Sequence, residues 1–438
     1  MQIQVLNRSY VLVLFLTFIG IGCSKSDSPD PIPPQPVPSI TSFSPSAAGA
    51  GEQVIITGTN FNVNPSSNIV KFNGVTATIS AATATQLTVT VPAGVTNGKL
   101  SVTVNNQTVT SPADFNLLGM VSTLAGSGAS GVLDGTGAAA KFGSINDLAF
   151  DATGNLYVAE AGAVRKITTA GVVTTLAGNG VFGFADGPGS AARFHGLMGI
   201  ALDGAGNVYS ADSYNNTIRK ITPEGIVSTI GGTGEAGYLD GPAATSLFNM
   251  PRGVAADNAG NVYVADGFNN RIRKISGGNV STVAGDGVIG FADGAVATAR
   301  FWYPDHIKID GAGNLIVSDI GNNRIRKIST TGMVSTIAGS GTKGYLDGPA
   351  ATAQFKSPEG LTIDQNGNIY VGDGSNHRVR KISTTGVVTT VAGTGDMAFE
   401  DGNTDIAKFA FPGGVIISST GIIYVADAAN NRIRKISF

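Results

Sequence analysis

The chain has 438 residues, enough for two or three domains. Charged residues make up only 13% and glycines number 61, a balance typical of a turn-rich β protein and not of a helical or disordered chain. The formal net charge of −2 gives no electrostatic attraction to nucleic acid, so we expect no nucleic-acid partner.

Residues 1–22 have the pattern of a secretory signal peptide. Arg8 gives a modest positive start, and residues 11–21 form an apolar run that is too short to span a bilayer. Small residues then precede Cys23, the only cysteine in the chain, and the segment resembles the lipobox of bacterial lipoproteins. The resemblance implies a lipid anchor on Cys23 and a place on the bacterial outer membrane, at its periplasmic or cell-surface face. An ordinary secreted protein is the alternative.

Residues 23–37 form a polar, proline-dense segment. Proline at this density favours extended polyproline II, which acts as a semi-rigid spacer, so this segment is predicted to be a tether. A chain with one cysteine cannot form an internal disulfide, so its stability must come from packed cores.

Residues 38–117 alternate apolar and polar positions in short runs such as 54–56, 87–91 and 100–104. This pattern predicts a β-sandwich of four to seven strands. The run from Pro38 to Pro45 and the later Val91-Pro92-Ala93-Gly94 resemble the IPT/TIG family. The resemblance implies an immunoglobulin-like domain that serves as a spacer, with direct ligand binding as the alternative.

Six Asp-Gly pairs recur at a period of about 53 residues through the rest of the chain. A period of this size marks a solenoid or a propeller, and each repeat holds four strand-like runs separated by turn residues. In the third repeat these runs are 253–257, 262–266, 271–275 and 280–284. Four antiparallel strands per repeat predict one propeller blade each. The aspartates of the pairs are Asp134, Asp186, Asp240, Asp293, Asp347 and Asp401.

Residues 260–275 carry the motif Gly-x-Val-Tyr-Val-Ala-Asp-x-x-Asn-Asn-Arg-Ile-Arg-Lys-Ile, which resembles NHL repeats of the teneurin and streptogramin-lyase type. The copy at 154–167 is two residues shorter and lacks the Asn pair. The predicted fold class is therefore all-β: an immunoglobulin-like IPT/TIG sandwich followed by a six-bladed NHL β-propeller. The other copies are 206–221, 313–328, 367–382 and 421–436.

The two ends of the repeat array predict how the ring closes. Residues 121–125 have the sequence of a fourth strand, whereas the chain ends on a third-strand sequence at 432–436. We therefore expect a propeller domain at 120–438 in which strand 121–125 completes the last blade and removes the exposed sheet edges.

Three repeated features are predicted to be structural. An aromatic residue two positions before the Asp-Gly aspartate, present in five repeats, is expected to pack onto its blade, with sugar stacking as the alternative. The Arg-Ile-Arg-Lys strands are expected to present solvated faces. A phenylalanine present in all six repeats is expected to be core: Phe142, Phe194, Phe248, Phe301, Phe355 and Phe409.

The functional candidates are the residues that do not repeat, where the innermost strands begin. Innermost strands line a propeller axis, so carboxylates, a histidine and an arginine at these positions predict a ligand site at the channel mouth. A calcium-like divalent cation is an alternative occupant, and no other cofactor is expected. These candidates are Asn146, Asp147, Arg252, Asp305, His306 and Glu359.

Blade four adds Trp302, the only tryptophan in the chain, and Tyr303 beside the Asp305-His306 pair. An aromatic platform next to acids suits a sugar, whose faces stack while its hydroxyls bond the carboxylates. Loop packing is the alternative reading of Trp302. His195 and Met250 lie in equivalent loops and are further candidates for the same mouth.

These features predict a membrane-anchored binding or scaffold lipoprotein that captures a glycan, peptide or protein ligand at the channel mouth, with no catalytic residue assigned. The alternative is a metal-dependent propeller hydrolase or lyase of the lactonase type. In that case the axis-facing acids would hold the metal and His306 would act in acid–base catalysis.

Overall fold

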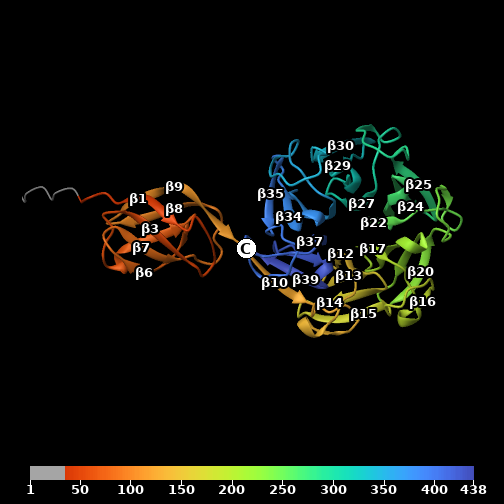
Figure 1. Cartoon of the computed structure of the whole chain (residues 1–438), viewed down its shortest axis with the longest axis horizontal. Helices are drawn as coiled ribbons and strands as arrows, with labels where there is room; N and C mark the ends of the chain where they lie inside the picture. The colour runs from red at the N-terminus through yellow and green to blue at the C-terminus, as the bar shows by residue number, and fades with distance from the viewer. Residues whose placement is uncertain (1–34) are drawn as a thin grey trace, which may run out of the picture.

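The computed structural model describes residues 35–438. Two β domains lie one after the other along its long axis, a sandwich and a ring of sheets, as predicted (Figure 1). The predicted signal peptide, Cys23 and most of the tether lie outside the described residues. Within residues 35–438, no helix has the length and apolar character needed to cross a membrane.

The N-terminal domain packs two sheets around one apolar core. The first sheet has the order β1 (Ser39–Ser44), β3 (Gln53–Thr59), β7 (Gln86–Thr90) and β6 (Thr78–Ala82). The second has the order β2 (Ala47–Gly49), β9 (Gln107–Leu118), β8 (Gly98–Val104), β4 (Asn68–Phe72) and β5 (Val75–Thr76). Alternate residues of each strand point inward, and Phe72 meets Phe115 edge to face in the core.

The C-terminal domain is a ring of six five-stranded sheets, each with four antiparallel strands and a two-residue outermost strand that the sequence did not predict. From the axis outward, blade 1 contains β12 (Ile145–Phe150), β13 (Leu156–Glu160), β14 (Ala163–Ile167), β15 (Val172–Gly178) and β11 (Gly135–Thr136). Blade 2 contains β17 (Leu197–Leu202), β18 (Val208–Asp212), β19 (Thr217–Ile221), β20 (Ile226–Gly231) and β16 (Gly187–Pro188). Blade 3 contains β22 (Pro251–Ala256), β23 (Val262–Asp266), β24 (Arg271–Ser276), β25 (Asn279–Ala284) and β21 (Gly241–Pro242).

The remaining blades follow the same order from the axis outward. Blade 4 contains β27 (Pro304–Ile309), β28 (Leu315–Asp319), β29 (Arg324–Ile328), β30 (Met333–Ala338) and β26 (Gly294–Ala295). Blade 5 contains β32 (Pro358–Ile363), β33 (Ile369–Asp373), β34 (Arg378–Ile382), β35 (Val387–Ala392) and β31 (Gly348–Pro349). Blade 6 contains β37 (Pro412–Ile417), β38 (Ile423–Asp427), β39 (Arg432–Ser437), β10 (Met120–Ala125) and β36 (Gly402–Asn403).

Short 3₁₀ turns connect these strands. In blades 2 to 6 one such turn joins the second strand to the third. These turns are η4 (Ser213–Asn215), η5 (Gly267–Asn269), η6 (Ile320–Asn322), η7 (Gly374–Asn376) and η8 (Ala428–Asn430). The others are η1 (Pro65–Ser67) in the sandwich, and η2 (Gly137–Ala139) and η3 (Gly189–Ala191) in the ring.

Blade 6 is built from both ends of the propeller domain. Strand β10 lies between β36 and β39, with Val121 opposite Ile436 and Thr123 opposite Arg434. Figure 1 shows β10 beside β39. The Val121 side chain is fully buried. The ring is thereby closed, and no long strand edge of blade 6 faces solvent.

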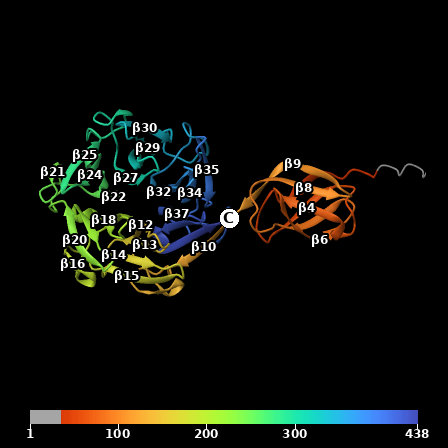
Figure 2. The same cartoon turned by 180° about the vertical axis from the view of Figure 1, so that it is seen from behind.

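A single residue, Gly119, separates the last strand of the sandwich from β10. The Thr404 amide donates a hydrogen bond to the Gly119 carbonyl, and Asn403 Nδ2 donates to Glu52 Oε1 at 2.9 Å. Asn403 stands where three other blades have proline, so blade 6 carries a polar side chain at the position that meets the sandwich. The two views in Figures 1 and 2 show the sandwich beside this blade.

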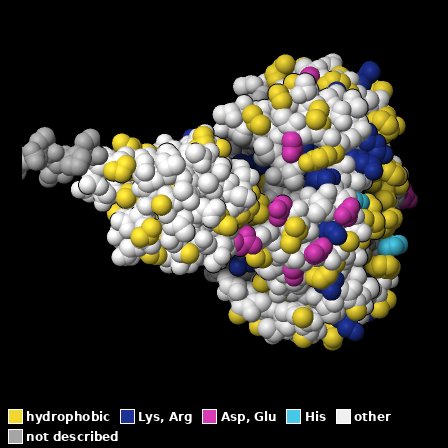
Figure 3. Space-filling view, turned by 60° about the vertical axis from the view of Figure 1, so that its left-hand side comes forward, with side chains coloured by type: hydrophobic (Ala, Val, Ile, Leu, Met, Phe, Trp, Pro, Cys, Tyr) yellow, Lys and Arg dark blue, Asp and Glu magenta, His cyan; other side chains and the backbone are white. Residues whose placement is uncertain are grey.

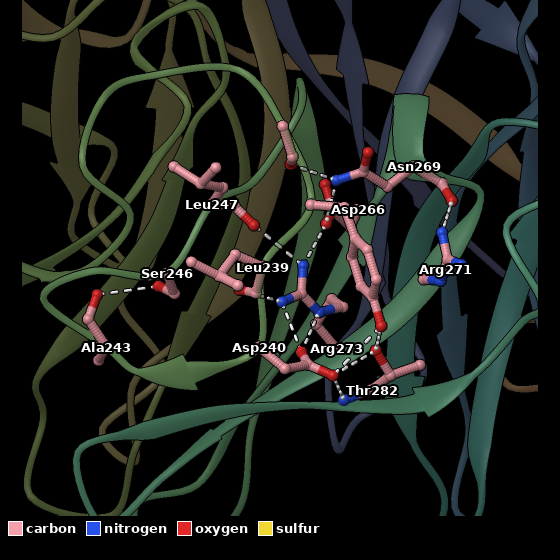
Figure 4. A network of polar contacts seen from close by, with 12 residues as sticks. Leu239, Asp240, Ala243, Ser246, Leu247, Asp266, Asn269, Arg271, Arg273 and Thr282 are labelled. Atoms are coloured by element: carbon pink, nitrogen blue, oxygen red, sulfur yellow. Dashed lines mark hydrogen bonds and ion pairs between the residues drawn. The ribbon is translucent and has the colours of Figure 1, made fainter.

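The prediction that the Arg-Ile-Arg-Lys strands present solvated faces is wrong for one arginine in each blade. Arg273 is fully buried, and its Nη1 lies 2.7 Å from Asp266 Oδ2 while its Nη2 lies 2.6 Å from Asp240 Oδ1 (Figure 4). Its guanidinium also donates to the carbonyls of Leu239 and Leu247. The buried equivalents are Arg165, Arg219, Arg326, Arg380 and Arg434.

This network explains why the Asp-Gly pairs recur. The other oxygen of Asp240 accepts hydrogen bonds from the amide and hydroxyl of Thr282, so one carboxylate ties the loop to two strands of its blade (Figure 4). Tyr238, two residues earlier, stacks on Arg271 with the guanidinium 4.0 Å from the ring centre. Packing, and not an open sugar platform, is therefore the role of this aromatic position. The six repeated phenylalanines are fully buried, as predicted.

Candidate functional site

The candidate residues gather at one end of the ring, where the innermost strands begin. Each innermost strand changes register there against its neighbour, in blade 4 between Pro304 and Ile307. Such a bulge re-aims side chains, because two residues then oppose one on the partner strand. Asp305 and His306, although consecutive, therefore both line the axial hollow.

A layer of glycines brings the innermost strands together below the mouth. A Cβ atom on Gly199 would lie 2.6 Å from the Cα atom of Gly253, and one on Gly414 would lie 2.6 Å from the Cα atom of Asp147. Neither contact is sterically allowed, so glycine is required at both positions. The hollow above this layer measures only ≈ 40 Å³. The hollow therefore has room for only a few water molecules or a small polar group.

Charged side chains of three blades form a row of ion pairs across the axis, called the charge row below. Arg252 Nε lies 2.5 Å from Asp305 Oδ1, and Asp305 Oδ2 lies 3.1 Å from His306 Nδ1. His306 Nε2 lies 3.0 Å from Asp147 Oδ1 as an ion pair without hydrogen-bond alignment. Lys308 Nζ, at the end of this charge row, lies 3.7 Å from Asp147 Oδ2. Positive and negative groups thus alternate.

The charges of this row determine which of its side chains are ionised at neutral pH. Burial disfavours a charged His306, but Asp147 and Asp305 outweigh that cost and raise the pKa of His306 to about 9. Burial likewise opposes the charge of Asp305, yet Arg252 and His306 hold the pKa of Asp305 below its usual range. For Glu359, burial and the nearby charge of Asp305 raise the pKa to about 7. At neutral pH Asp305 and His306 are therefore both ionised, while Glu359 is partly protonated.

A pH dependence of stability follows from His306. Its unfolded pKa is about 6.5 and its folded pKa is about 9, so its charge stabilises the fold fully below pH 6.5 and less as the pH rises through 9. We expect the free energy of unfolding to fall by up to about 3 kcal/mol over that interval.

The check is chemical denaturation at pH 6 to 9.5. His306→Gln should flatten the alkaline slope, whereas His195→Gln, at the stacked surface histidine, should keep the wild-type slope. An unchanged slope in His306→Gln would show that another group titrates.

Next to the axial hollow lies a second, more open groove of ≈ 630 Å³. Its walls include Phe268, Ile289, Trp302, Tyr303 and Ile320. Trp302 is 49% exposed, although its amide is held by Asp319 Oδ1 at 2.9 Å. The groove is thus a firmly placed aromatic surface that is open to solvent.

Tyr303 connects the groove with the axis. Its ring lies 5.1 Å from that of Phe268 on the groove side, and the Arg252 guanidinium lies 5.3 Å from its centre on the axial side. Tyr303 is thus the residue shared by the groove and by the surroundings of Arg252.

The backbone of these mouth loops is strained. Tyr303 has φ 56°, and Met250 and Phe411 occupy the equivalent positions in blades 3 and 6 with φ 49° and 53°. Glycine, which adopts such angles freely, fills only the blade 2 position, Gly196. Bulky residues cost roughly 1 kcal/mol each in this conformation, and strain of this kind clusters at functional sites.

The aromatic surface continues over blade 2. The rings of Phe182 and His195 stack at 5.1 Å, and His195 lies 4.9 Å from Tyr214. Phe182, Tyr214 and Phe268 are each more than half exposed. In Figure 3 hydrophobic side chains and a histidine gather along the right-hand edge of the propeller.

The eight residues predicted to bind ligand separate into two levels. Arg252, Asp305, Glu359 and Asn146 border the axial hollow, and Trp302 and Tyr303 line the groove. His306 borders the hollow as well, whereas Asp147 is not among its lining residues; both side chains are buried and pair with each other. Their role is to hold the neighbouring side chains. Asn146 is also largely committed, since its Nδ2 donates to the Leu197 carbonyl.

Sequence reasoning missed Phe268, Tyr214 and Phe182. Phe268 and Tyr214 stand in the loop between the second and third strands, where other blades have glycine, serine or alanine. The departure from the repeat was the available signal, the same one that pointed to Trp302.

The arrangement offers little to a metal ion. The carboxylates of Asp147 and Asp305 already pair with Lys308, His306 and Arg252. Across residues 35–438, no three His, Cys, Asp or Glu side chains form a group that could hold a metal.

Comparison with known families agrees with this architecture. Residues 38–116 match the IPT/TIG domain, and residues 248–275 and 355–382 match the NHL repeat. The chain thus carries an IPT/TIG domain followed by an NHL-repeat propeller.

Proteins of similar sequence occur in a plant and in a mammal. Protein SUPPRESSOR OF QUENCHING 1, chloroplastic, of Arabidopsis thaliana is 29% identical over an alignment of 284 residues that covers 60% of this chain and 27% of that protein. Teneurin-4 of Mus musculus is 26% identical over an alignment of 331 residues that covers 65% of this chain and 12% of its own length. The chain therefore spans about a quarter or less of these curated relatives.

A solved structure extends the likeness to both domains. The crystal structure of an auxiliary nutrient binding protein from Bacteroides thetaiotaomicron VPI-5482 superposes with a TM-score of 0.59 at 18% identity. The superposition covers 92% of this chain and 98% of that one. The two proteins share a fold.

Proposed function

We propose that the protein captures an oligosaccharide at the mouth of the propeller. The observation that carries this proposal is the open groove in which Trp302, Tyr303 and Phe268 present aromatic surface beside amide and hydroxyl side chains. Aromatic faces stack on the apolar faces of sugar rings, while Asn249 and Ser357, which also line the groove, suit hydroxyl groups. Capture of a nutrient would parallel the auxiliary nutrient binding protein of Bacteroides thetaiotaomicron, which has the same fold.

Calorimetry against a panel of oligosaccharides tests this function. Trp302→Ala and Phe268→Ala should each weaken binding about tenfold, because each removes one stacking surface, worth about 1.4 kcal/mol. Tyr345→Ala is the matched control, since this half-exposed aromatic stacks on Arg378 of its own blade. If no sugar binds but a peptide or protein does, and Trp302→Ala abolishes that binding, the groove is the binding site and its ligand is not a glycan.

The proposal includes anchoring through Cys23. Cleavage before Cys23 and lipidation there would hold the propeller at a bacterial outer membrane by the proline-dense tether. Metabolic labelling with a fatty-acid analogue tests the anchor, since Cys23→Ser should lose both the label and membrane association. A label retained in that variant would contradict it.

A further inference from the structure

Arg252 differs from the repeated arginines of the ring in having most of its guanidinium uncommitted. Its Nε is held by Asp305 Oδ1, but Nη1 and Nη2 have no hydrogen-bond partner among residues 35–438. In contrast, both Nη atoms of buried Arg273 are bonded. The Arg252 side chain is 18% exposed and borders the axial hollow, so its two free nitrogens are available to a ligand.

The orientation of this guanidinium is fixed before any ligand arrives. Asp305 holds one edge at 2.5 Å, and the Tyr303 ring lies 5.3 Å from the guanidinium carbon. Asp305 is itself held by His306. A planar, prealigned fork of this kind matches a carboxylate, which accepts two parallel N–H bonds.

The charges around the hollow favour one additional negative group. Three cations, Arg252, His306 and Lys308, face two carboxylates, Asp147 and Asp305. Glu359 of β32 is the remaining titratable group at the hollow, and its carboxyl oxygens have no hydrogen-bond partner in the described part of the chain. On its other side it faces the buried Asp373 of β33, whose charge is balanced by Arg380. Blades 2 and 6 contribute the uncharged Met198 and Gly413. With Glu359 protonated, the floor of the mouth carries one net positive charge.

We infer that the mouth recognises an acidic glycan through a uronic acid residue, whose carboxylate binds Arg252 while its ring stacks in the groove. This inference rests on the proposed function. A uronate joins its carboxylate directly to the sugar ring, which suits a site in which a single residue, Tyr303, lines the groove and lies against Arg252. Asp305 and His306 are positioning residues in this arrangement.

The experiment compares uronate oligosaccharides with the same molecules after reduction of each carboxyl to an alcohol, by calorimetry on the whole protein. The acidic form should bind at least tenfold more tightly. Arg252→Met should lower its affinity to that of the reduced form, and Arg252→Lys, which keeps the charge but not the fork, should recover only part. Arg300→Met, at an exposed arginine paired with Asp286, is the control and should change nothing.

The pH profile gives a second readout. The pKa of Glu359 is raised to about 7, so its negative charge, which repels a carboxylate, appears as the pH rises from 6 to 8. Affinity for the uronate should fall over this interval, and Glu359→Gln should abolish the fall. Affinity for the reduced oligosaccharide should not change with pH.

The outcomes separate the two claims. If acidic and reduced forms bind equally and Arg252→Met has no effect on either, the uronate inference is wrong while glycan capture stands. If a sulfated sugar without a carboxyl binds as tightly as the uronate, the carboxylate assignment is wrong. If no oligosaccharide binds, the proposed function and this inference both fail. Arg252→Met that still binds the reduced form is folded, so its loss of uronate affinity supports the inference.

Discussion

Replacing residues 121–125 with a Gly-Ser linker in the full chain should open the ring and destabilise the propeller by roughly 5 kcal/mol or more. The replacement removes a buried valine, worth about 2 kcal/mol, and the hydrogen bonds of β10 to β39, worth about 1 kcal/mol each. It also removes the Thr123 hydrogen bonds to Asp401. The newly exposed edges of β39 and β36 should promote association.

Chemical denaturation followed by the fluorescence of Trp302 measures the stability of the propeller alone. Trp302 is the only tryptophan and lies in blade 4, so its fluorescence during denaturation reports the propeller and not the sandwich. Met120→Ser, at a half-exposed side chain of the same strand, is the control and should stay within about 0.5 kcal/mol of wild type. A linker variant with an unchanged midpoint and a monomeric profile in size-exclusion chromatography would show that β10 does not close the ring.

The blades could be predicted from sequence because each repeat carries its own turn chemistry and apolar periodicity. The hairpin aspartate of blade 3, Asp257, accepts hydrogen bonds from Ala259 and Asn261, a local interaction that its spacing already indicates. The sandwich followed in the same way from its alternating strands.

The buried arginines could not be predicted from spacing alone. Arg271 and Arg273 are two residues apart on one strand, and the outward packing of Arg271 on Tyr238 looks the same in sequence as the burial of Arg273. Burial of the second depends on Asp240, 33 residues earlier, which reaches it only in the folded blade. A repeated acid at a fixed distance from a repeated arginine was the available clue.

The sequence alone also could not predict how deeply each residue of the channel mouth is buried. Asp305 and His306 are neighbours, yet the bulge in β27 puts both at the hollow and places His306 between two carboxylates. The same row of charges lies across the axis and holds Arg252 in place. The deviations from the repeat therefore supply both the ion pairs across the axis and the residues of the mouth.

The second large effect concerns the buried network of blade 3. Arg273→Met should destabilise the propeller by about 3–5 kcal/mol, because it leaves Asp266 buried without its counter-charge. Lys274→Met, at the next and partly exposed position, should cost less than about 1 kcal/mol. Denaturation followed through Trp302 measures both.

A double variant identifies the cause of that loss. If the uncompensated carboxylate is responsible, Arg273→Met combined with Asp266→Asn should be more stable than the sum of the two single effects, because the amide removes the buried charge. Asp266 also accepts the Asn249 amide and the Asn269 side chain, so recovery should be partial. Strict additivity would mean that the arginine acts mainly by filling space and binding the carbonyls of Leu239 and Leu247. The pairing of Arg273 with Asp266 would then be a packing requirement more than an ion pair.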